Sequence, residues 1–238
     1  MDSPLLSIVT VTYNAKDIIA ATVDSIIQHK TDDVEYIIID GASNDGTAEI
    51  IRDKYTDGVD IFISEPDNGI YDAMNKAIGL VSGRYFIFIN CGDMLLANPL
   101  DLIPASAITD EYDLIFFNVN ISDGRTFKSK ISFASKIANT LHHQGLLYRN
   151  NKSLKFDINY KVHADFDLNQ RILKGKGIKY LYIDKSICYH HVGGLSHDLA
   201  FFHENYDIVL KNFGRTFVLL SFFYFKWQGL KVRLFKLL

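Results

Sequence analysis

The chain has 238 residues, 48% of them apolar, and a formal net charge of −3, which suits one α/β domain with a substantial core. No long basic run precedes the C-terminal segment, so a nucleic-acid partner is disfavoured, and two distant cysteines, Cys91 and Cys188, do not form a disulfide framework. No apolar run has the length of a membrane span and the N-terminus lacks a basic signal-peptide start, so we expect a reduced, cytoplasmic protein.

Short β-branched segments alternate with segments of helical spacing along the first part of the chain. Ile19, Val23 and Ile26 recur at the spacing of a helix between two apolar runs, LSIVTVT and VEYIIID. In chain order, the predicted strands are 6–12, 34–40, 59–63, 85–90, 114–119 and 178–183. The further predicted helices are 46–55, 70–81 and 164–174. Strands that are apolar on both faces and alternate with helices indicate a parallel sheet covered on each side.

The alternation loosens after Pro99, which we interpret as a boundary between two halves of one domain. We therefore expect a single domain at residues 1–214, with one half at 1–100 and the other at 101–214. Residues 215–238 form a tail of different composition.

Polar residues follow four predicted strands, at the edge where open parallel sheets bind ligands. These residues are Thr12, Tyr13, Asn14, Asp40, Glu65, Asp67, Asn68, Cys91, Gly92 and Asp93. Turn or helix-capping roles are the alternative. We accept that alternative for Ser43, Asn44 and Asp45, but not for Asp40 together with Asp93.

The motifs of several common nucleotide and metal sites are missing from the sequence. It has no G-x-G-x-x-G, no P-loop motif and no zinc-binding motif, which disfavours those three kinds of site. A carboxylate at a strand end can instead hold a divalent cation, and the cation can bridge the two phosphates of a nucleotide diphosphate.

Three motifs together resemble a known family: SIVTVTYNA, YIIIDGASNDGT and SEPDNGIYDAMNKAIGLVSGRYFIFINCGD. The chain resembles the family 2 glycosyltransferases, inverting enzymes with the GT-A fold, closely over residues 5–100 and more loosely over 140–195. The segments GIYDAMNK, SG and INCGD look like the bacterial branch that builds surface polysaccharides. The resemblance implies a mostly parallel nucleotide-binding sheet flanked by helices, to which this chain adds a C-terminal amphipathic helix.

The resemblance also implies a UDP-type donor site along the strand ends. Thr12 and Tyr13 would flank the base, and Asp40 would hold the uracil or the ribose. The helix that begins near Gly69 would bring two polar side chains toward the donor, although a plain surface helix is the alternative. The implied nucleotide-binding residues are Thr12, Tyr13, Asn14, Asp40, Asn75, Lys76, Cys91 and Gly92.

A divalent cation, Mn²⁺ or Mg²⁺, is implied by the same resemblance. Asp93 aligns with the last acid of the family's metal-binding D-x-D motif, whereas Cys91 replaces the first acid and is interpreted as a small substitute for serine rather than a nucleophile. One carboxylate, diphosphate oxygens and water can complete an octahedral site. Some related enzymes place a C-terminal histidine on the metal, and we assign this role to His191 in YHHVGGLSH, with His190 as the alternative.

The segment VHADFDLNQRIL resembles the family segment in which an acid at the start of a helix faces the acceptor. Asp165 matches that acid and is predicted to be the general base. Positions two apart on a helix point about 200° from each other, so only one of Asp165 and Asp167 can face the site. The alternative is that both acids favour the helix N-terminus. His143, Gln144 and Asp167 are assigned to the cleft for the acceptor or the donor sugar.

Residues 216–238 have the pattern of a basic amphipathic helix, and no acid follows Asp207. Its apolar stripe consists of Leu220, Phe223, Trp227, Leu230, Leu234 and Leu237. Its far side carries Lys226, Arg233 and Lys236. This pattern is typical of a helix that lies at a membrane interface, whereas packing on the core or on a second copy is the alternative.

The sequence thus predicts an inverting glycosyltransferase at the cytoplasmic face of the inner membrane. It would transfer a sugar from a nucleotide diphosphate donor of UDP type to a hydroxyl of a lipid-linked or surface glycan. Two alternatives remain open: a nucleotidyltransferase, and a nucleotide-sugar-binding protein that has lost catalysis, as Cys91 would allow. Release of UDP rather than pyrophosphate would distinguish a glycosyltransferase from a nucleotidyltransferase. Turnover with any acceptor would exclude a binding protein without catalysis.

Overall fold

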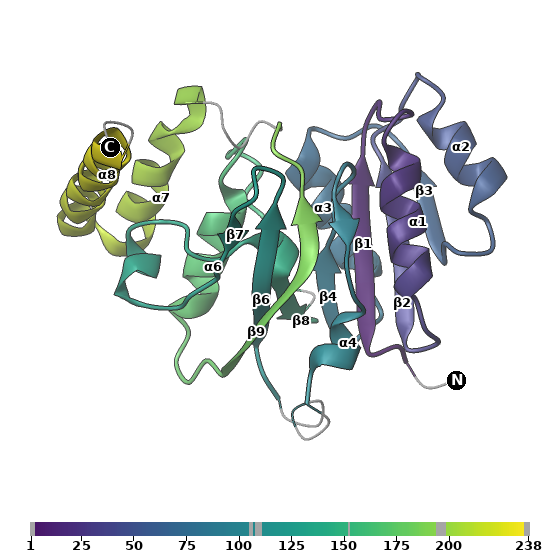
Figure 1. The fold of residues 1–238 in the computed structure, drawn as a ribbon, viewed down its shortest axis with the longest axis horizontal. Coiled ribbons are helices and arrows are strands. Elements are labelled where there is room, and N and C mark those ends of the chain that lie inside the picture. Colours follow the sequence, from purple (N-terminus) through teal and green to yellow (C-terminus); the bar gives the residue numbers. More distant parts are fainter. Residues whose placement is uncertain (1–2, 105–106, 108–110, 152, 194–198, 236–238) are drawn as a thin grey trace.

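One mixed sheet forms the centre of the computed structural model, which describes residues 3–104, 107, 111–151, 153–193 and 199–235. Within that part of the chain the sheet has nine strands in the order β3-β2-β1-β4-β8-β6-β9-β5, and β7 pairs with β6. Helices cover both faces of the sheet (Figure 1). The helix α2 and strand β3 lie at one end of the long axis, and α7 and α8 lie at the other.

The first half is a parallel sheet, as the sequence predicts. Its strands are β1 (Leu6–Thr12), β2 (Val34–Asp40), β3 (Ile61–Ser64) and β4 (Tyr85–Phe88). Its helices are α1 (Ile19–His29), α2 (Thr47–Lys54) and α3 (Ile70–Leu80). Thr12 pairs in register with Asp40, and Asp40 with Ser64, so the carboxyl ends of three strands form one row.

The chain after β4 continues the same sheet. Its strands are β5 (Met94–Leu95), β6 (Leu114–Ile121), β7 (Thr126–Phe127), β8 (Leu146–Arg149) and β9 (Tyr180–His190). Its helices are α4 (Pro99–Leu102), α6 (Ala164–Leu173), α7 (His203–Phe213) and α8 (Arg215–Phe235), with single 3-10 turns η1 (Phe133–Lys136), η2 (His143–Gly145) and η4 (Leu199–Phe201). Strand β8 is antiparallel to both β4 and β6, and it joins the two halves.

Two apolar layers stabilise the sheet, one on each face. Ile8 and Ile38 belong to the layer that contains the buried face of α1, whereas their neighbours Val9 and Ile37 belong to the layer that contains α3. Successive strand residues point to opposite faces, so a strand covered on both sides has an uninterrupted apolar sequence. This burial explains why the strands of the first half are recognisable from sequence.

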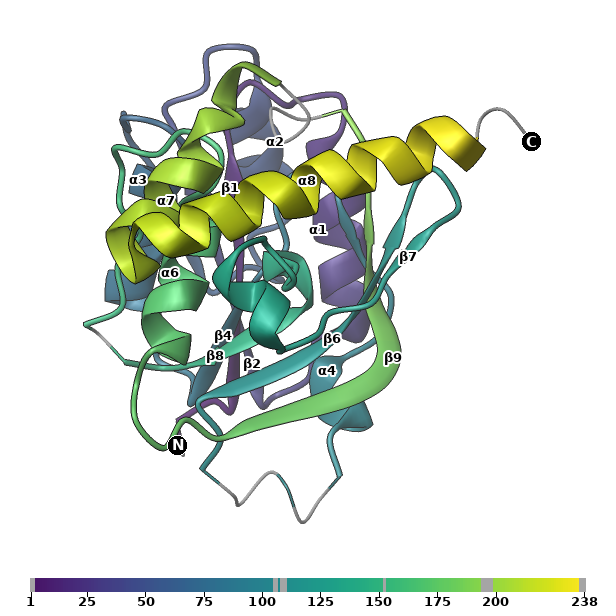
Figure 2. The ribbon, with the colours of Figure 1, turned by 90° about the vertical axis from the view of Figure 1, so that its left-hand side faces the viewer.

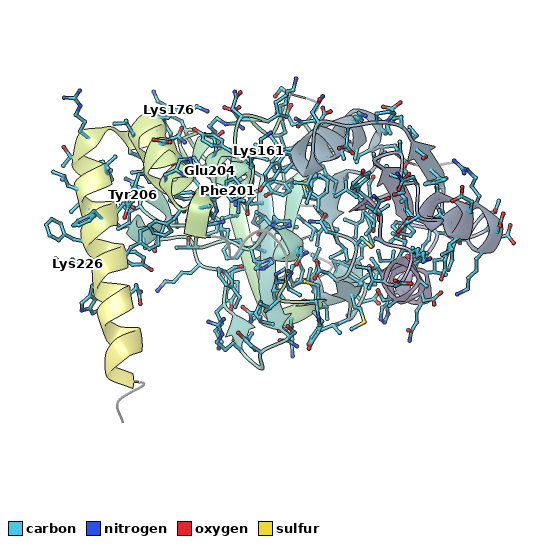
Figure 3. All side chains as sticks on the ribbon, turned by 90° about the horizontal axis from the view of Figure 1, so that it is seen from above. Lys161, Lys176, Phe201, Glu204, Tyr206 and Lys226 are labelled. Carbon is cyan, nitrogen blue, oxygen red and sulfur yellow. The ribbon has the colours of Figure 1, made fainter. Side chains whose placement is uncertain are left out.

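A buried carboxylate on α7 holds the chain that leads into α6. Glu204 is 4% exposed and accepts hydrogen bonds from the backbone N–H groups of Lys161 (2.7 Å), Val162 (3.1 Å) and His163 (3.0 Å). Figure 3 labels Glu204 on α7 and Lys161 near it. Buried backbone N–H groups need a partner, and one side chain supplies it for three consecutive residues. Glu204 therefore fixes the start of α6.

Helix α3 holds the same segment from the side of the first half. The amide of Asn75 accepts from the backbone N–H of Phe156 (2.8 Å) and donates to the Phe156 carbonyl (3.0 Å). One turn earlier, the Tyr71 hydroxyl donates to the carbonyl of Val162. The residues before α6 are thus tied to both halves of the domain.

Helix α8 packs one of its faces on the domain. The Ser221 hydroxyl is fully buried and donates to the Ile137 carbonyl at 2.6 Å. The Phe225 ring contacts the rings of Phe202 and Tyr206, with centroids 4.8 and 6.3 Å apart. Figure 2 shows α8 lying across the face of the molecule that also carries α6 and the short turn η1. The face opposite the apolar stripe therefore packs on the domain at Ser221 and Phe225. Of the cations predicted for the far side, Lys226 is exposed, and the side chains of Arg233 and Lys236 lie outside the described part of the structure.

The apolar stripe of α8 points away from the domain. Leu220, Phe223 and Trp227 are 40, 62 and 54% exposed, so packing of the stripe on the core is excluded at these positions. Leu219 and Phe222 extend the exposed apolar surface, and Lys226 is exposed beside it. The side chains of Leu230 and Leu234, and all of Leu237, lie outside the described part of the structure. No helix in that described part combines the length and apolarity required to cross a membrane.

Replacing Glu204 by alanine leaves three N–H groups without their acceptor. We expect Glu204→Ala to lower the free energy of unfolding by about 1–3 kcal/mol, the usual effect of leaving buried polar groups unpaired. Glu49→Ala is the matched control, because Glu49 is exposed on α2. Chemical denaturation of the two variants and the parent measures the difference. Equal stability of both variants would show that water replaces the Glu204 carboxylate without cost.

Candidate functional site

The carboxylate of Asp93 lies at the junction of the two halves. It is 4% exposed, and its Oδ1 accepts from the ring Nδ1 of His190 (3.0 Å) and from the backbone N–H of His191 (2.8 Å). Its Oδ2 accepts from the side-chain amide of Gln144. Strand β5 begins directly after Asp93 and pairs antiparallel with the end of β9. This pairing brings the two histidines at the end of β9 to Asp93. The predicted metal ligand is therefore surrounded by groups from the second half.

His190, and not His191, presents its ring to Asp93. Strand alternation explains this correction, since neighbouring residues point to opposite sides and only one of the two rings can face the site. The side chain of His191 is exposed, and this residue contributes its backbone N–H. Residues 194–197, which complete the second histidine motif, lie outside the described residues.

His143 connects the end of β4 with the start of α6. Its Nε2 lies 3.1 Å from the side-chain amide nitrogen of Asn90, and its Nδ1 lies 3.4 Å from Oδ2 of Asp165. Nδ1–H of His143 donates to the Asp165 carboxylate, and Nε2 lies against the Asn90 amide. Asn139 donates a second hydrogen bond to the same carboxylate oxygen at 3.1 Å.

The environment of Asp165 keeps its carboxylate ionised. Burial by itself raises the pKa of this carboxyl, but the hydrogen bond and charge of His143, with the charge of His163, bring the pKa below its ordinary value of 3.8. The side chain is nevertheless 7% exposed and lines a cavity. Asp165 is thus an anionic proton acceptor, oriented by an imidazole, at the wall of an open space.

That cavity has a volume of about 430 Å³. Its walls come from the β6–β7 hairpin, the segment around η2 and the start of α6. The lining residues are Ile121, Arg125, Thr126, Phe127, Asn139, Leu141, His142, His143, Val162, His163, Asp165 and His190. The His142 ring packs against the rings of His143 and His190, with centroids 5.4 and 4.9 Å away. Burial lowers the pKa of His142 well below 6.5, so this imidazole is neutral at pH 7.

The structure does not bring Asp167 to this cavity. Asp167 is fully buried and forms ion pairs with Arg171 (2.8 Å) and Lys211 (3.2 Å), and Asn212 donates to it at 3.1 Å. It connects α6 to α7. Gln144 does lie at the junction, through its contact with Asp93.

Asp40 at the end of β2 shapes its own loop. It is fully buried, its Oδ1 accepts from the Ser43 hydroxyl (2.5 Å), and its Oδ2 accepts from the Ser43 N–H (3.0 Å) and the Ser64 hydroxyl (2.6 Å). Asn14, with a positive φ of 47°, holds the same loop by accepting from the Asn44 N–H at 3.0 Å. The carboxylate itself is therefore not at the surface of the strand-end rim.

Tyr13, Gly41 and Asp67 meet at that rim. Tyr13 is 62% exposed, Asp67 is half-buried and Gly41 is buried between them. A Cβ on Gly41 would lie 2.5 Å from a carboxylate oxygen of Asp67 and 3.2 Å from the Tyr13 ring, so a larger residue would displace the Asp67 side chain. Asp67 was noted from sequence as a residue that follows a strand, but it was not selected as a site residue.

Asn75 and Lys76 make other contacts. Asn75 binds the backbone of Phe156, as described above, and Lys76 donates to the Pro66 carbonyl (2.6 Å) and pairs with Glu65 (2.9 Å). Lys76 thus lies over the loop after β3.

Cys91 and Gly92 form the turn that leads to Asp93. Burial raises the pKa of the Cys91 thiol, and the nearby Thr12 hydroxyl opposes this only in part, so the thiol is protonated at neutral pH. Gly92 adopts a φ of 95° and donates its N–H to the Thr22 hydroxyl at 3.0 Å. The described residues contain no group of three or more His, Cys, Asp or Glu side chains arranged to hold a metal ion by themselves.

Several buried polar atoms around the junction have no hydrogen-bond partner within the described structure. They are Oδ1 of Asn90, Nδ1 of His142 and Oε1 of Gln144. Each such atom costs about 1–3 kcal/mol when it stays unpaired, so their concentration here indicates a place that a polar ligand or water completes. Asn90 directly precedes Cys91, and the strand-end rule applied one residue earlier would have selected it.

Comparison with known families matches residues 7–196 to the model of "Glycosyl transferase family 2". A PGL/p-HBAD biosynthesis glycosyltransferase of Mycobacterium bovis is 28% identical over 217 residues, covering 84% of this chain and 82% of the relative. The Escherichia coli protein WfgD, a UDP-Glc:alpha-D-GlcNAc-diphosphoundecaprenol beta-1,3-glucosyltransferase, is 25% identical over 137 residues, 58% of this chain and 54% of its own.

Two solved structures share the fold at low sequence identity. S. aureus TarS 1-349 in complex with UDP-GlcNAc has a TM-score of 0.64 at 19% identity and covers 85% of this chain and 64% of its own. The mannosyltransferase PcManGT from Pyrobaculum calidifontis, in complex with GDP-Man and Mn²⁺, has a TM-score of 0.63 at 16% identity. The match covers 87% of this chain and 64% of the mannosyltransferase chain. This chain therefore spans less than two thirds of either chain, and the likeness confirms the expected GT-A type of fold.

Proposed function

This chain belongs to glycosyl transferase family 2 and is a glycosyltransferase, and we propose that it inverts the anomeric centre as it transfers a sugar from a UDP-sugar. We propose a hydroxyl of a lipid-linked or surface glycan as the acceptor. The observation that carries the proposal is the ionised Asp165, oriented by His143 at the wall of a cavity that Asp93 and His190 adjoin. The UDP-GlcNAc complex of TarS supports the donor class, and the name of WfgD supports a diphospholipid-linked acceptor.

In the proposed transfer reaction, the proton of the acceptor hydroxyl moves to Asp165. The acceptor hydroxyl occupies the cavity and gives its proton to the Asp165 carboxylate while its oxygen forms a bond to the anomeric carbon. The bond from that carbon to the diphosphate oxygen breaks, and UDP leaves with the electron pair. The lowered pKa of Asp165 keeps the carboxylate ionised and able to accept this proton at neutral pH. His143 keeps the accepting oxygen aimed during the step.

The donor would lie across the strand ends, between this junction and the exposed rim. Tyr13 offers an exposed ring for stacking on the base, and the Asp67 carboxylate beside Gly41 offers an acceptor for a base N–H. Asp40 then acts indirectly, because its bonds to Ser43 and Ser64 shape the loop that borders this place.

The residues at the junction fit a divalent cation. Oδ1 of Asp93 and Nδ1 of His190 are 3.0 Å apart, so the two atoms would hold one cation together in place of the hydrogen bond between them. His190 would be a ligand as the neutral imidazole, and diphosphate oxygens and water would supply the other positions. A bound cation would neutralise charge on the leaving diphosphate.

The exposed face of α8 would lie in a membrane interface. Leu219, Phe222, Phe223 and Trp227 leave a continuous apolar ridge on the helix, and Lys226 is exposed within it. A helix with aromatic residues and cations on its outer face is suited to the boundary between headgroups and acyl chains. This location would hold the enzyme next to an acceptor carried on a lipid.

Asp165→Asn should reduce turnover by about 10²–10⁴, the range for loss of a general base, because the amide keeps the size of the side chain but accepts no proton. UDP affinity should stay within error, since the nucleotide lies at the strand ends. Asp167→Asn is the matched control: it should affect turnover far less and lower stability, because it weakens the ion pairs with Arg171 and Lys211. The reverse pattern in assays of UDP release would transfer the role to Asp167.

His190→Ala should weaken Mn²⁺ binding by about tenfold or more in calorimetry with saturating UDP, an effect of at least the size seen when groups that support a metal site are removed. His191→Ala is the control and should bind like the parent, because its ring is exposed and its N–H remains. EDTA should abolish turnover, and Mn²⁺ or Mg²⁺ should restore it. Cys91→Asp should strengthen Mn²⁺ binding without nucleotide. Full activity in EDTA would remove the cation from the mechanism.

The α8 ridge predicts the effect of two polar substitutions. Phe223→Ser with Trp227→Ser should reduce sedimentation with lipid vesicles by at least about tenfold, because both exposed apolar side chains are removed. Leu96→Ser is the control, since Leu96 is 40% exposed but far along the chain from α8. Turnover with a soluble acceptor should be unchanged in both. Undiminished sedimentation of the double variant would assign membrane binding to another surface.

A further inference from the structure

A second cavity lies beside α8, separate from the active-site cavity. Its volume is about 540 Å³, and η1, the end of α6, the start of β9 and the end of α7 form its walls. Among its lining residues are Ser132, Lys136, Gln170, Lys174, Tyr180 and Phe213. None of them takes part in the proposed transfer reaction, so this cavity needs its own explanation.

Two lysines give the cavity a positive rim. Nζ of Lys136 lies 5.8 Å from the centre of the Phe213 ring, and Nζ of Lys174 lies 5.7 Å from the same centre. Both side chains are exposed, and neither ammonium group has a carboxylate within ion-pair distance in the part of the chain that the structure describes. Two cations held over one aromatic ring form a site for an anion.

The floor of the cavity offers a hydrogen-bond acceptor. Gln170 is 1% exposed; its Nε2 donates to the Ser135 carbonyl at 3.2 Å, and its Oε1 has no partner within the described structure. Ser132 uses its oxygen to accept from the Ala134 N–H, which leaves its O–H available as a donor. An unpaired buried acceptor requires a donor from a ligand or from water. A ligand that fits has an anionic group and at least one hydroxyl.

The cavity is next to the first turn of α8, which precedes the exposed ridge along the helix. Nζ of Lys136 lies 5.8 Å from the centre of the Phe217 ring in the first turn of α8, and the Phe133 ring lies 5.9 Å from it. Phe133 is 58% exposed, so it extends the apolar surface toward the cavity. Figure 2 shows α8 and the region of η1 and α6 on the same face of the molecule. A surface that meets the acyl chains through α8 would hold these lysines at headgroup level.

We propose that this cavity binds the headgroup of an anionic, hydroxyl-bearing membrane lipid, with the phosphate at Lys136 and Lys174 and a headgroup hydroxyl at Gln170. The proposal rests on the membrane location of α8, and it adds lipid selectivity to it. Lipid is favoured over a soluble phosphorylated polyol because the cations border an apolar ridge, the arrangement that suits the acyl and headgroup layers together. The site fixes how the protein is oriented on the membrane.

The test compares vesicles of phosphatidylcholine alone with vesicles that also contain phosphatidylglycerol. Lys136→Gln with Lys174→Gln should lose about tenfold to thirtyfold in affinity for the mixed vesicles and nothing for the neutral ones. Lys176→Gln with Lys179→Gln is the control, because it removes the same charge from nearby exposed positions outside the cavity. If both pairs lose affinity equally, the attraction is unspecific and the site is refuted.

The remaining arms separate this site from the α8 ridge and from other occupants. Phe223→Ser with Trp227→Ser should weaken binding to both kinds of vesicle, so failure of the ridge is distinguishable from failure of the headgroup site. Gln170→Leu should reduce affinity for phosphatidylglycerol to that for phosphatidic acid, which has no headgroup hydroxyl. Soluble glycerol phosphate that binds the parent tightly, while the lysine variant keeps its vesicle affinity, would assign the cavity to a free metabolite. A dimer of the parent that the ridge variant dissociates would assign the ridge to a second copy.

Discussion

The geometry of the candidate site depends on hydrogen bonds between side chains and the backbone of the segment before α6. Three consecutive N–H groups there, that of buried Val162 in the middle, belong to neither a helix ladder nor a strand ladder, and Glu204 is their acceptor. Tyr71 binds the Val162 carbonyl from the opposite side. Because polar backbone groups cannot stay buried without partners, these contacts decide where α6 begins. The position of Asp165 in the first turn of α6, and hence its distance to His143, follows from that decision.

The continuous sheet brings the two halves of the site together. Strand β8 pairs with β4 on one edge and with β6 on the other, so η2, which directly precedes β8, lies against the end of β4. His143 therefore meets Asn90, and Gln144 meets Asp93. On the other side, the pairing of β5 with β9 brings His190 to the same carboxylate. Five residues from three segments that are distant in sequence thus converge through strand pairing.

The strands and helices of the first half were predictable, because burial on both faces gives their sequences an uninterrupted apolar character. Strands β5, β7 and β8 were not, since two to four residues are too few to show a period. The choice between His190 and His191 depends on strand register, which a single sequence does not contain. Asp167 and Glu204 are both acids near the start of a helix, and only tertiary packing distinguishes an ion-pair anchor from a backbone acceptor.

Helix α8 has one face packed on the domain and one exposed apolar face, and positive charge collects at the same end of the chain. One face packs on the domain through Ser221 and Phe225, whereas the side chains of Phe223 and Trp227 on the other face are exposed. The chain as a whole is acidic, yet no acid follows Asp207, so positive charge collects at the end that carries the exposed apolar ridge. An anionic lipid surface attracts this end and repels the acidic remainder. The cavity rimmed by Lys136 and Lys174 lies beside the first turn of α8. If α8 lies at a membrane as proposed, electrostatic orientation and apolar burial would act on one face of the protein, and the cavity at Asp165 would keep a constant position relative to the membrane.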